Sequence, residues 1–202
     1  MHLDEERNLF RDTIRSFVGK EIEPNVEEWE SSEKIPRDLF KRLGQLGFLG
    51  LEFPSKYGGG DSDFWMTTIL AEELARCRSG GVAFSVMVHT DMSSPWLARL
   101  GTEEQQARYL PGIISGDIVC ALAITEPSAG SDMASLNTSA RQDGQEWVIS
   151  GAKTFITNGV YGDLYFVAAR TNKNGPRHQQ LSQFLVERNT PGLTVTNKLS
   201  KT

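Results

Sequence analysis

The sequence predicts an α+β fold in which an all-helical N-terminal domain precedes an antiparallel β-sandwich or barrel domain. Through about the first 115 residues, apolar side chains recur at the three- and four-residue steps of a helix with one buried face. After Gly116 the pattern changes to short apolar runs separated by turn signals such as Asp143-Gly144. We therefore expect two domains, residues 1–116 and 117–202.

Three helices are expected before the break at Ser79-Gly80-Gly81, with a glycine-rich connection between the second and the third. The first carries an apolar face from Leu9 to Ile22, and Pro24 ends or bends it. The second has Pro36 in its first turn, a position where the missing N–H costs nothing. The third is capped by Ser62 or Asp63, because either side chain can accept a free N–H of the first turn.

Two further helices and then strands are expected. The fourth helix runs from about Val82 to Leu100 with a kink at Pro95. Thr102 opens the fifth through a capping box. The expected strands are Ile118 to Thr125, Leu136 to Gln142, Glu146 to Ile149, Lys153 to Thr157, Asp163 to Arg170, Gln180 to Val186 and Leu193 to Thr196.

Composition excludes several classes of function. The net charge of −5, from 21 basic and 26 acidic residues, argues against a nucleic-acid surface. Cys77 and Cys120 form no C-x-x-C pair, which favours a reducing compartment over a disulfide scaffold. We find no signal peptide and no apolar run approaching the roughly 18 residues of a membrane span, so a cytoplasmic protein is expected. The three histidines are scattered, and no metal site is predicted.

The most informative string is ALAITEPSAGSDMAS, from Ala121 to Ser135. Its apolar run has strand character and stops at Pro127, which removes a backbone donor. Gly130 permits a conformation or a close approach that a Cβ would block. Ser131 and Asp132 can turn oxygens and N–H groups toward a ligand. Taken alone, the string is a cradle for an anionic or heteroaromatic ligand, or an ordinary strand followed by an Asx turn.

A second string, GAKTFITNG, runs from Gly151 to Gly159. Taken alone, it predicts a strand that enters an Asn-Gly hairpin turn. Phe155 and Thr157 are then expected on one face of the strand and Ile156 on the other.

Together these residues resemble the acyl-CoA dehydrogenase family. The Thr-Glu-Pro and Gly-Ser-Asp of the first string resemble the family's first signature. The segments Leu46 to Gly50, Pro54 to Gly59 and Gly101 to Pro111 also resemble family segments, and they occur in the family's order. The resemblance implies an N-terminal helical domain and a middle β domain that is incomplete here. It also implies a C-terminal four-helix domain that lies beyond Thr202.

The resemblance implies FAD as the cofactor, bound without a Rossmann fold, since the chain has no G-x-G-x-x-G motif. Phe155 is expected to cover the flavin and Thr157 to hydrogen-bond near flavin N5. Ser131 is expected near both the FAD pyrophosphate and the acyl-CoA. The full implied cofactor set is Leu122, Ile124, Thr125, Gly130, Ser131, Phe155, Ile156 and Thr157.

The implied substrate is an acyl-CoA thioester. The family threads the acyl chain beside the fourth helix, so Met87, Thr90 and Ser94 join Ser131 as candidate substrate residues. Ordinary helix packing is the alternative for each of the first three. Glu126 is interpreted as a structural part of its loop and not as a base.

The implied reaction is α,β-dehydrogenation with hydride transfer to flavin N5, in fatty acid β-oxidation. Electron-transfer flavoprotein is the expected electron acceptor and a homotetramer the expected assembly. No catalytic residue is assigned, because the family's glutamate base is expected beyond Thr202, and we expect the chain alone to dehydrogenate poorly or not at all. The alternatives are a non-catalytic or partner-dependent half of a split enzyme, an acyl-CoA oxidase, or a dehydrogenase of carrier-protein thioesters.

Overall fold

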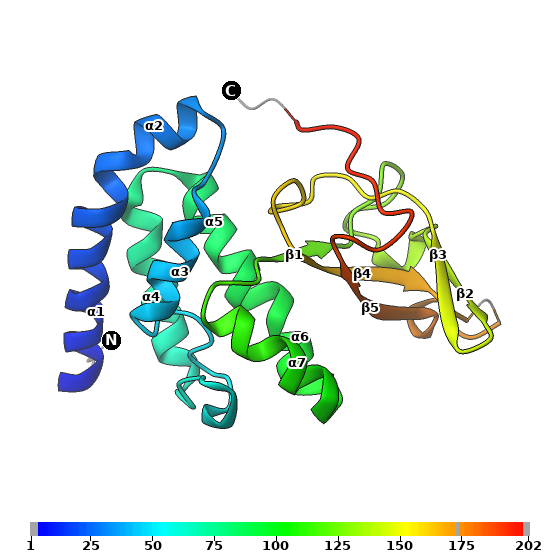
Figure 1. Cartoon of the computed structure of the whole chain (residues 1–202), viewed down its shortest axis with the longest axis horizontal. Coiled ribbons are helices and arrows are strands. Elements are labelled where there is room, and N and C mark those ends of the chain that lie inside the picture. The colour runs from blue at the N-terminus through cyan, green and yellow to red at the C-terminus, as the bar shows by residue number, and fades with distance from the viewer. Residues whose placement is uncertain (1–3, 173, 200–202) are drawn as a thin grey trace. The chain divides into compact units, whose positions relative to one another are not determined.

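A computed structural model describes residues 4–172 and 174–199. Residues 1–3 of the first predicted domain and residues 173 and 200–202 of the second lie outside the described residues. The chain divides into a helical unit that ends at Val119 and a β unit that begins at Cys120 (Figure 1). The predicted order, helices followed by a sheet, is confirmed. Among the described residues, no helix combines the length and the apolar character needed to cross a membrane.

The first predicted helix is a continuous helical segment in which the helix type changes three times. α1 (Glu5–Phe17) passes into a π-helical turn (Val18–Ile22), a 3₁₀ turn (Glu23–Asn25) and α2 (Val26–Ser31). Pro24 lies in the 3₁₀ turn, so it bends the helical path and does not end it.

The second and third predicted helices are confirmed, and one of the two proposed caps is selected. α3 (Arg37–Gln45) follows Pro36, and α4 (Phe64–Leu74) is capped by Asp63. The Asp63 carboxylate accepts the N–H groups of Trp65 and Met66 at 3.1 and 3.4 Å. Apolar side chains of α1, α3 and α4 form one buried core that includes Ile14, Leu43, Ile69 and Leu70.

The fourth predicted helix is also a continuous helical segment in which the helix type changes. α5 (Gly80–Met87) passes into a π-helical turn (Val88–Ser93) and then α6 (Ser94–Leu100), with Pro95 in the first turn of α6. The predicted irregularity at Pro95 therefore extends over the preceding turn. The capping box that opens α7 (Glu103–Ile114) is confirmed, because Thr102 and Gln105 exchange side-chain-to-backbone hydrogen bonds.

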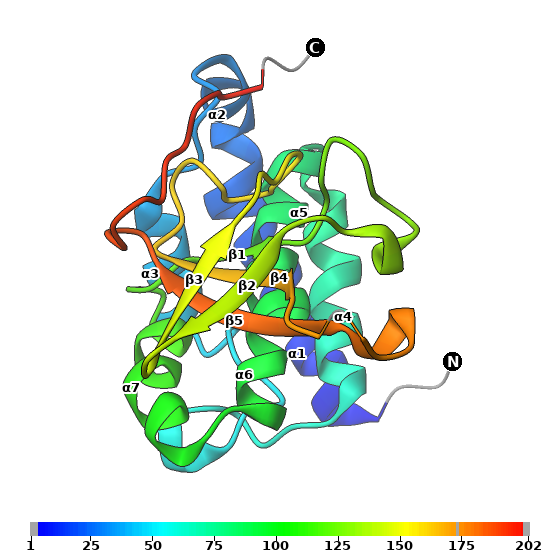
Figure 2. The same ribbon diagram turned by 90° about the vertical axis from the view of Figure 1, so that its right-hand side faces the viewer.

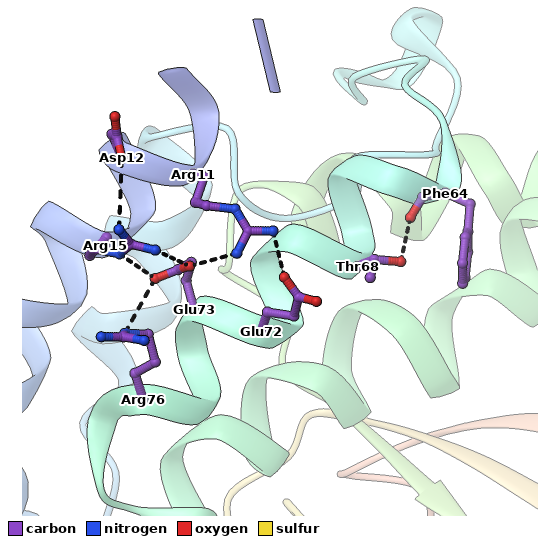
Figure 3. Close-up of polar contacts among 8 residues, drawn as sticks. All are labelled: Arg11, Asp12, Arg15, Phe64, Thr68, Glu72, Glu73 and Arg76. Carbon is purple, nitrogen blue, oxygen red and sulfur yellow. Dashed lines mark hydrogen bonds and ion pairs between the residues drawn. The ribbon is translucent and has the colours of Figure 1, made fainter. Parts of the chain in front are cut away.

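A buried carboxylate on α4 holds α1 in place (Figure 3). Glu73 is 1% exposed. It accepts hydrogen bonds from Arg11 at 3.0 Å and from Arg15 at 2.9 Å, and Arg76 lies 3.5 Å from it. The Arg15 guanidinium lowers the pKa of Glu73 below its ordinary value. Glu73 is therefore an ionised anchor between the two helices.

The β unit contains one mixed sheet. Among its described residues the strands are β1 (Cys120–Ala123), β2 (Ser139–Asp143), β3 (Glu146–Ser150), β4 (Leu164–Arg170) and β5 (Leu181–Glu187). The β2–β3 and β4–β5 pairs are antiparallel, as predicted. The β1–β4 and β2–β4 pairs are parallel, which corrects the expectation of a purely antiparallel sheet. A parallel pair needs a crossover connection, and the segment between β1 and β4, which contains the β2–β3 hairpin, provides one.

The hairpin of β2 and β3 meets β4 at one register position, Ser139 opposite Arg170, and crosses over β5 (Figure 2). Trp147 of β3 contacts Phe184 of β5, with ring centroids 5.4 Å apart. The turn predicted at Asp143-Gly144 is confirmed as the hairpin connection. The strand predicted over Leu193 to Thr196 is wrong, because this segment pairs with no strand among the described residues.

Candidate functional site

The end of β1 is a tight turn followed by an open loop. Glu126 and Ala129 exchange backbone hydrogen bonds of 2.8 and 3.2 Å, and Pro127 occupies the second position, which suits its fixed φ. Gly130 follows, and its φ does not lie in the left-handed region. A Cβ on Gly130 would meet no protein atom within 4 Å. Neither the backbone conformation nor the packing of the chain therefore requires glycine, and the space beside it is open.

The second string is not the predicted strand. Phe155 and Asn158 have φ values of 56° and 62°, which a β-strand cannot contain. The Asn158 side chain donates to the Cys120 carbonyl at 2.9 Å, and the Gly159 N–H donates to the Ile156 carbonyl at 2.9 Å. These contacts hold an irregular loop in which the Phe155 ring is 69% exposed. A bulky aromatic residue kept in the left-handed region and displayed to solvent is typical of functional sites.

The two strings lie side by side. The Thr154 N–H donates to the Thr125 carbonyl at 2.9 Å. The Lys153 ammonium donates to the Ile124 carbonyl at 2.9 Å and to the Glu126 carboxylate at 2.8 Å. The fold thus brings together residues that are about thirty positions apart in the sequence, as the resemblance implied.

Glu126 is the electrostatic centre of this junction. Its carboxylate is buried and also accepts the backbone N–H groups of Asn137 and Thr138, at 2.6 and 2.9 Å. Burial alone would raise the pKa of Glu126. The hydrogen bonds from Lys153, Thr138 and Asn137 outweigh it and lower the pKa to about 2. Glu126 is therefore an ionised acceptor whose two carboxylate oxygens both bind donors of the chain itself.

We expect a pH-dependent loss of stability from Glu126. Its pKa falls from an ordinary value of 4.5 to about 2 on folding, so its ionised form stabilises the fold fully above pH 4.5. That contribution should disappear as the pH falls from 4.5 to about 2. Urea unfolding of the wild type and Glu126→Gln at several pH values would measure it. The difference between the two proteins should shrink across this window, and a constant difference would contradict the assignment.

The side chains of the apolar candidates Leu122, Ile124 and Ile156 lie partly within the β unit. Ile156 packs into an apolar cluster with Ala121 and Ala123 on one face of β1. Leu122 belongs to the opposite face by alternation, and Ile124 packs with a second apolar cluster there. These three side chains are partly buried and do not share the exposed surface of Phe155.

Several polar groups of the two loops form no hydrogen bond with another described residue. Within the described part of the chain, the hydroxyls of Thr125, Ser131 and Thr157 make no hydrogen bond. In the same part, the backbone N–H groups from Phe155 to Thr157 donate to no acceptor. An exposed aromatic ring beside unused donors suits a planar heteroaromatic ligand with acceptor atoms at its edge.

The candidate substrate residues Met87, Thr90 and Ser94 lie in the helical unit. Thr90 and Ser94 are buried and hydrogen-bonded within it. Thr90 is 4% exposed, and its hydroxyl accepts the Gly50 N–H at 2.9 Å. Ser94 is fully buried, and its hydroxyl donates to the His89 carbonyl at 2.6 Å. These contacts agree with ordinary helix packing, the alternative stated for them. Met87 is half-buried and makes no such contact.

Comparison with known proteins identifies the family. The family model for the acyl-CoA dehydrogenase N-terminal domain matches residues 4–117, and that for the middle domain matches residues 121–202. The chain belongs to the acyl-CoA dehydrogenase family. The family is flavin-dependent, and its cofactor is FAD.

Individual relatives agree with this assignment. The rat mitochondrial long-chain specific acyl-CoA dehydrogenase is 38% identical over 97% of this chain and 45% of its own length. The crystal structure of an acyl-CoA dehydrogenase from Geobacillus kaustophilus superposes with a TM-score of 0.93 at 40% identity, covering 99% of this chain and 52% of that one. The crystal structure of a glutaryl-CoA dehydrogenase from Mycobacterium smegmatis in complex with FADH2 superposes with a TM-score of 0.88 at 35% identity. The match covers 98% of this chain and 50% of that one. The chain spans about half the length of these relatives.

The residues present fit part of an FAD site. An isoalloxazine ring needs a flat apolar neighbour and hydrogen-bond donors at its nitrogen and carbonyl edge. The exposed Phe155 ring provides the first. The free N–H groups of Phe155 to Thr157 and the Thr157 hydroxyl provide the second.

Sequence reasoning missed the link between the loops. Lys153 was part of the second string but was given no partner, although a lysine inside an otherwise apolar, strand-like run is a signal for a buried pair. Its partner Glu126 is 27 residues earlier, so no local pattern connects the two.

Proposed function

We propose that this chain forms the helical and middle domains of an FAD-dependent acyl-CoA dehydrogenase. The reaction removes a proton from the α-carbon of an acyl-CoA thioester and a hydride from its β-carbon, which leaves a double bond. FAD, when bound, supplies the hydride acceptor at its N5 atom. The observation that carries the proposal is the junction of the two loops, which displays Phe155 beside unused hydrogen-bond donors.

The chain's own residues have three tasks in this proposal. The Phe155 ring covers the flavin and keeps water from one side of it. The Thr157 hydroxyl and the neighbouring N–H groups orient the ring by hydrogen bonds, and Thr125 contributes its hydroxyl from the first loop. Ser131 and the open space beside Gly130 accept the pyrophosphate of the cofactor and the thioester substrate. Met87 forms part of the acyl-chain wall.

A second candidate is a half that binds flavin but depends on a partner for catalysis. It is favoured by the state of Glu126, the acidic residue of the first signature. With a pKa of about 2 and three hydrogen-bond donors around it, this carboxylate is too weak a base to remove an α-proton. The base is then supplied by residues outside the two loops.

The family resemblance extends the proposal to partners and setting. It supports electron-transfer flavoprotein as the electron acceptor, a homotetramer as the complete assembly, and fatty acid β-oxidation as the context. An acyl-CoA oxidase and a dehydrogenase of carrier-protein thioesters stay within the same proposal, because the residues of the two loops do not distinguish them from an acyl-CoA dehydrogenase.

Anaerobic visible spectroscopy tests the proposal. The purified chain is mixed with FAD and then with acyl-CoAs of several chain lengths, alone and with the C-terminal domain of a full-length relative. We expect bound flavin in both samples and bleaching by acyl-CoA only in the second. Bleaching by the chain alone would exclude the partner-dependent candidate. Absence of flavin binding in both samples would contradict the proposed function.

A further inference from the structure

A buried ion pair is among the contacts that join the two flavin loops. The Glu126 and Lys153 side chains are 3% and 11% exposed, and their charged atoms lie 2.8 Å apart. Two charges removed from water in this way cost several kcal/mol unless their geometry is good and their other hydrogen-bonding positions are filled. Here the charged atoms are in hydrogen-bond contact, and each group has further partners, which distinguishes the pair from the exposed ion pairs of the same unit.

Glu126 fixes the first loop to the strand that follows it. One carboxylate oxygen accepts the Thr138 N–H at 2.9 Å and the other accepts the Asn137 N–H at 2.6 Å. The same residue closes the tight turn with Ala129 through its backbone. Thr125 precedes Glu126 directly, so the position of Glu126 determines where the Thr125 hydroxyl and carbonyl lie.

Lys153 extends this arrangement to the second loop. Its ammonium group donates to both the Glu126 carboxylate and the Ile124 carbonyl. The next residue, Thr154, donates its N–H to the Thr125 carbonyl at 2.9 Å, and Phe155 follows it. The left-handed backbone of Phe155 costs about 1–2 kcal/mol in a residue other than glycine, so fixed flanking contacts are needed to maintain it.

We propose that Glu126 and Lys153 form a positioning pair that sets the Phe155 and Thr157 loop against the Thr125 loop for flavin binding. The inference rests on the proposed function and assigns these two residues a role in cofactor affinity beyond their role in stability. Neither side chain needs to touch the cofactor. Their effect passes through the backbone of Thr125 and of Thr154 to Phe155.

Lysine-to-methionine substitution separates positioning from stability. Lys153→Met keeps most of the side-chain volume and removes the charge that joins the loops. FAD affinity is measured by quenching of flavin fluorescence at a temperature where circular dichroism shows the variant to be fully folded. We expect the Kd for FAD to rise about tenfold or more and the visible flavin band to lose its fine structure.

Arg141→Met is the matched control, because Arg141 forms an exposed ion pair with Asp143 in the same unit. Its Kd should stay within about twofold of the wild-type value.

A double-mutant cycle tests whether the two residues act as one unit. Glu126→Gln should also weaken FAD binding, and the Glu126→Gln/Lys153→Met double variant should be no weaker than the worse single variant. Lys153→Gln, which keeps one donor, is the milder variant to use where Lys153→Met does not fold. Wild-type chain that does not bind FAD would contradict the proposed function itself. A folded Lys153 variant with wild-type Kd and spectrum, or unfolding of both Lys153 variants, would overturn the positioning role.

Discussion

Replacing Glu73 by alanine should lower the free energy of unfolding of the helical unit by about 3 kcal/mol. The Glu73 carboxylate is the shared acceptor for Arg11 and Arg15 of α1 and also lies close to Arg76 (Figure 3). Its removal leaves these guanidinium groups without their buried counter-charge. The loss lies at the lower end of the range for buried pairs, because Arg15 and Arg76 are 48% and 60% exposed and can turn to water.

Glu72→Ala is the control for Glu73→Ala. Glu72 precedes Glu73 on α4 and pairs with Arg11, and its side chain is 50% exposed. Its loss should cost about 1 kcal/mol or less. Urea unfolding followed by far-ultraviolet circular dichroism, which reports mainly on the helices, measures both variants. Equal losses in the two variants would show that Glu73 is no special anchor of α1.

Replacing Phe155 by glycine should weaken FAD binding while leaving the protein at least as stable. The ring is 69% exposed, so its removal costs little packing, and glycine adopts the φ of 56° without strain. We expect the free energy of unfolding to stay level or rise by about 1 kcal/mol. Loss of the stacking surface should raise the Kd for FAD about five- to 150-fold, the usual effect of removing an aromatic ring beneath a heteroaromatic ligand.

Phe155→Tyr is the control for Phe155→Gly, because it keeps the ring at the same backbone position. Its Kd for FAD should stay within about twofold of the wild-type value. Fluorescence titration and thermal unfolding of the three proteins give both quantities. A glycine variant that binds FAD as tightly as the wild type would remove Phe155 from the flavin site.

Local chemistry predicted the helical unit well. The capping box at Thr102 and the Asp63 cap each depend on residues within one turn of each other, and both are confirmed. Pro36 was predicted in the first turn of its helix and lies at the N-cap just before it. The π-helical turns at Val18–Ile22 and Val88–Ser93 were not predicted, because the apolar spacing through them does not differ from that of an α-helix.

The sheet and the site were predicted less completely, since both depend on distant pairs. The parallel pairing of β1 with β4 joins strands about forty residues apart in the chain, and turn signals between them favour neighbouring hairpins. The alternating pattern of Lys153 to Thr157 predicted a strand, whereas Phe155 is held in the left-handed region by its surroundings. Both loops were proposed as candidate ligand loops from their residues, but the contact of Glu126 with Lys153 becomes visible only in three dimensions.

The central claim is that the Thr125 and Phe155 loops of this chain form a flavin-binding surface. Titration of FAD with the purified chain, followed by flavin fluorescence, tests it most directly. We predict saturable quenching with one FAD per chain, because the exposed Phe155 ring and the free donors beside it receive the isoalloxazine ring. Fluorescence that does not change with added chain would contradict the claim.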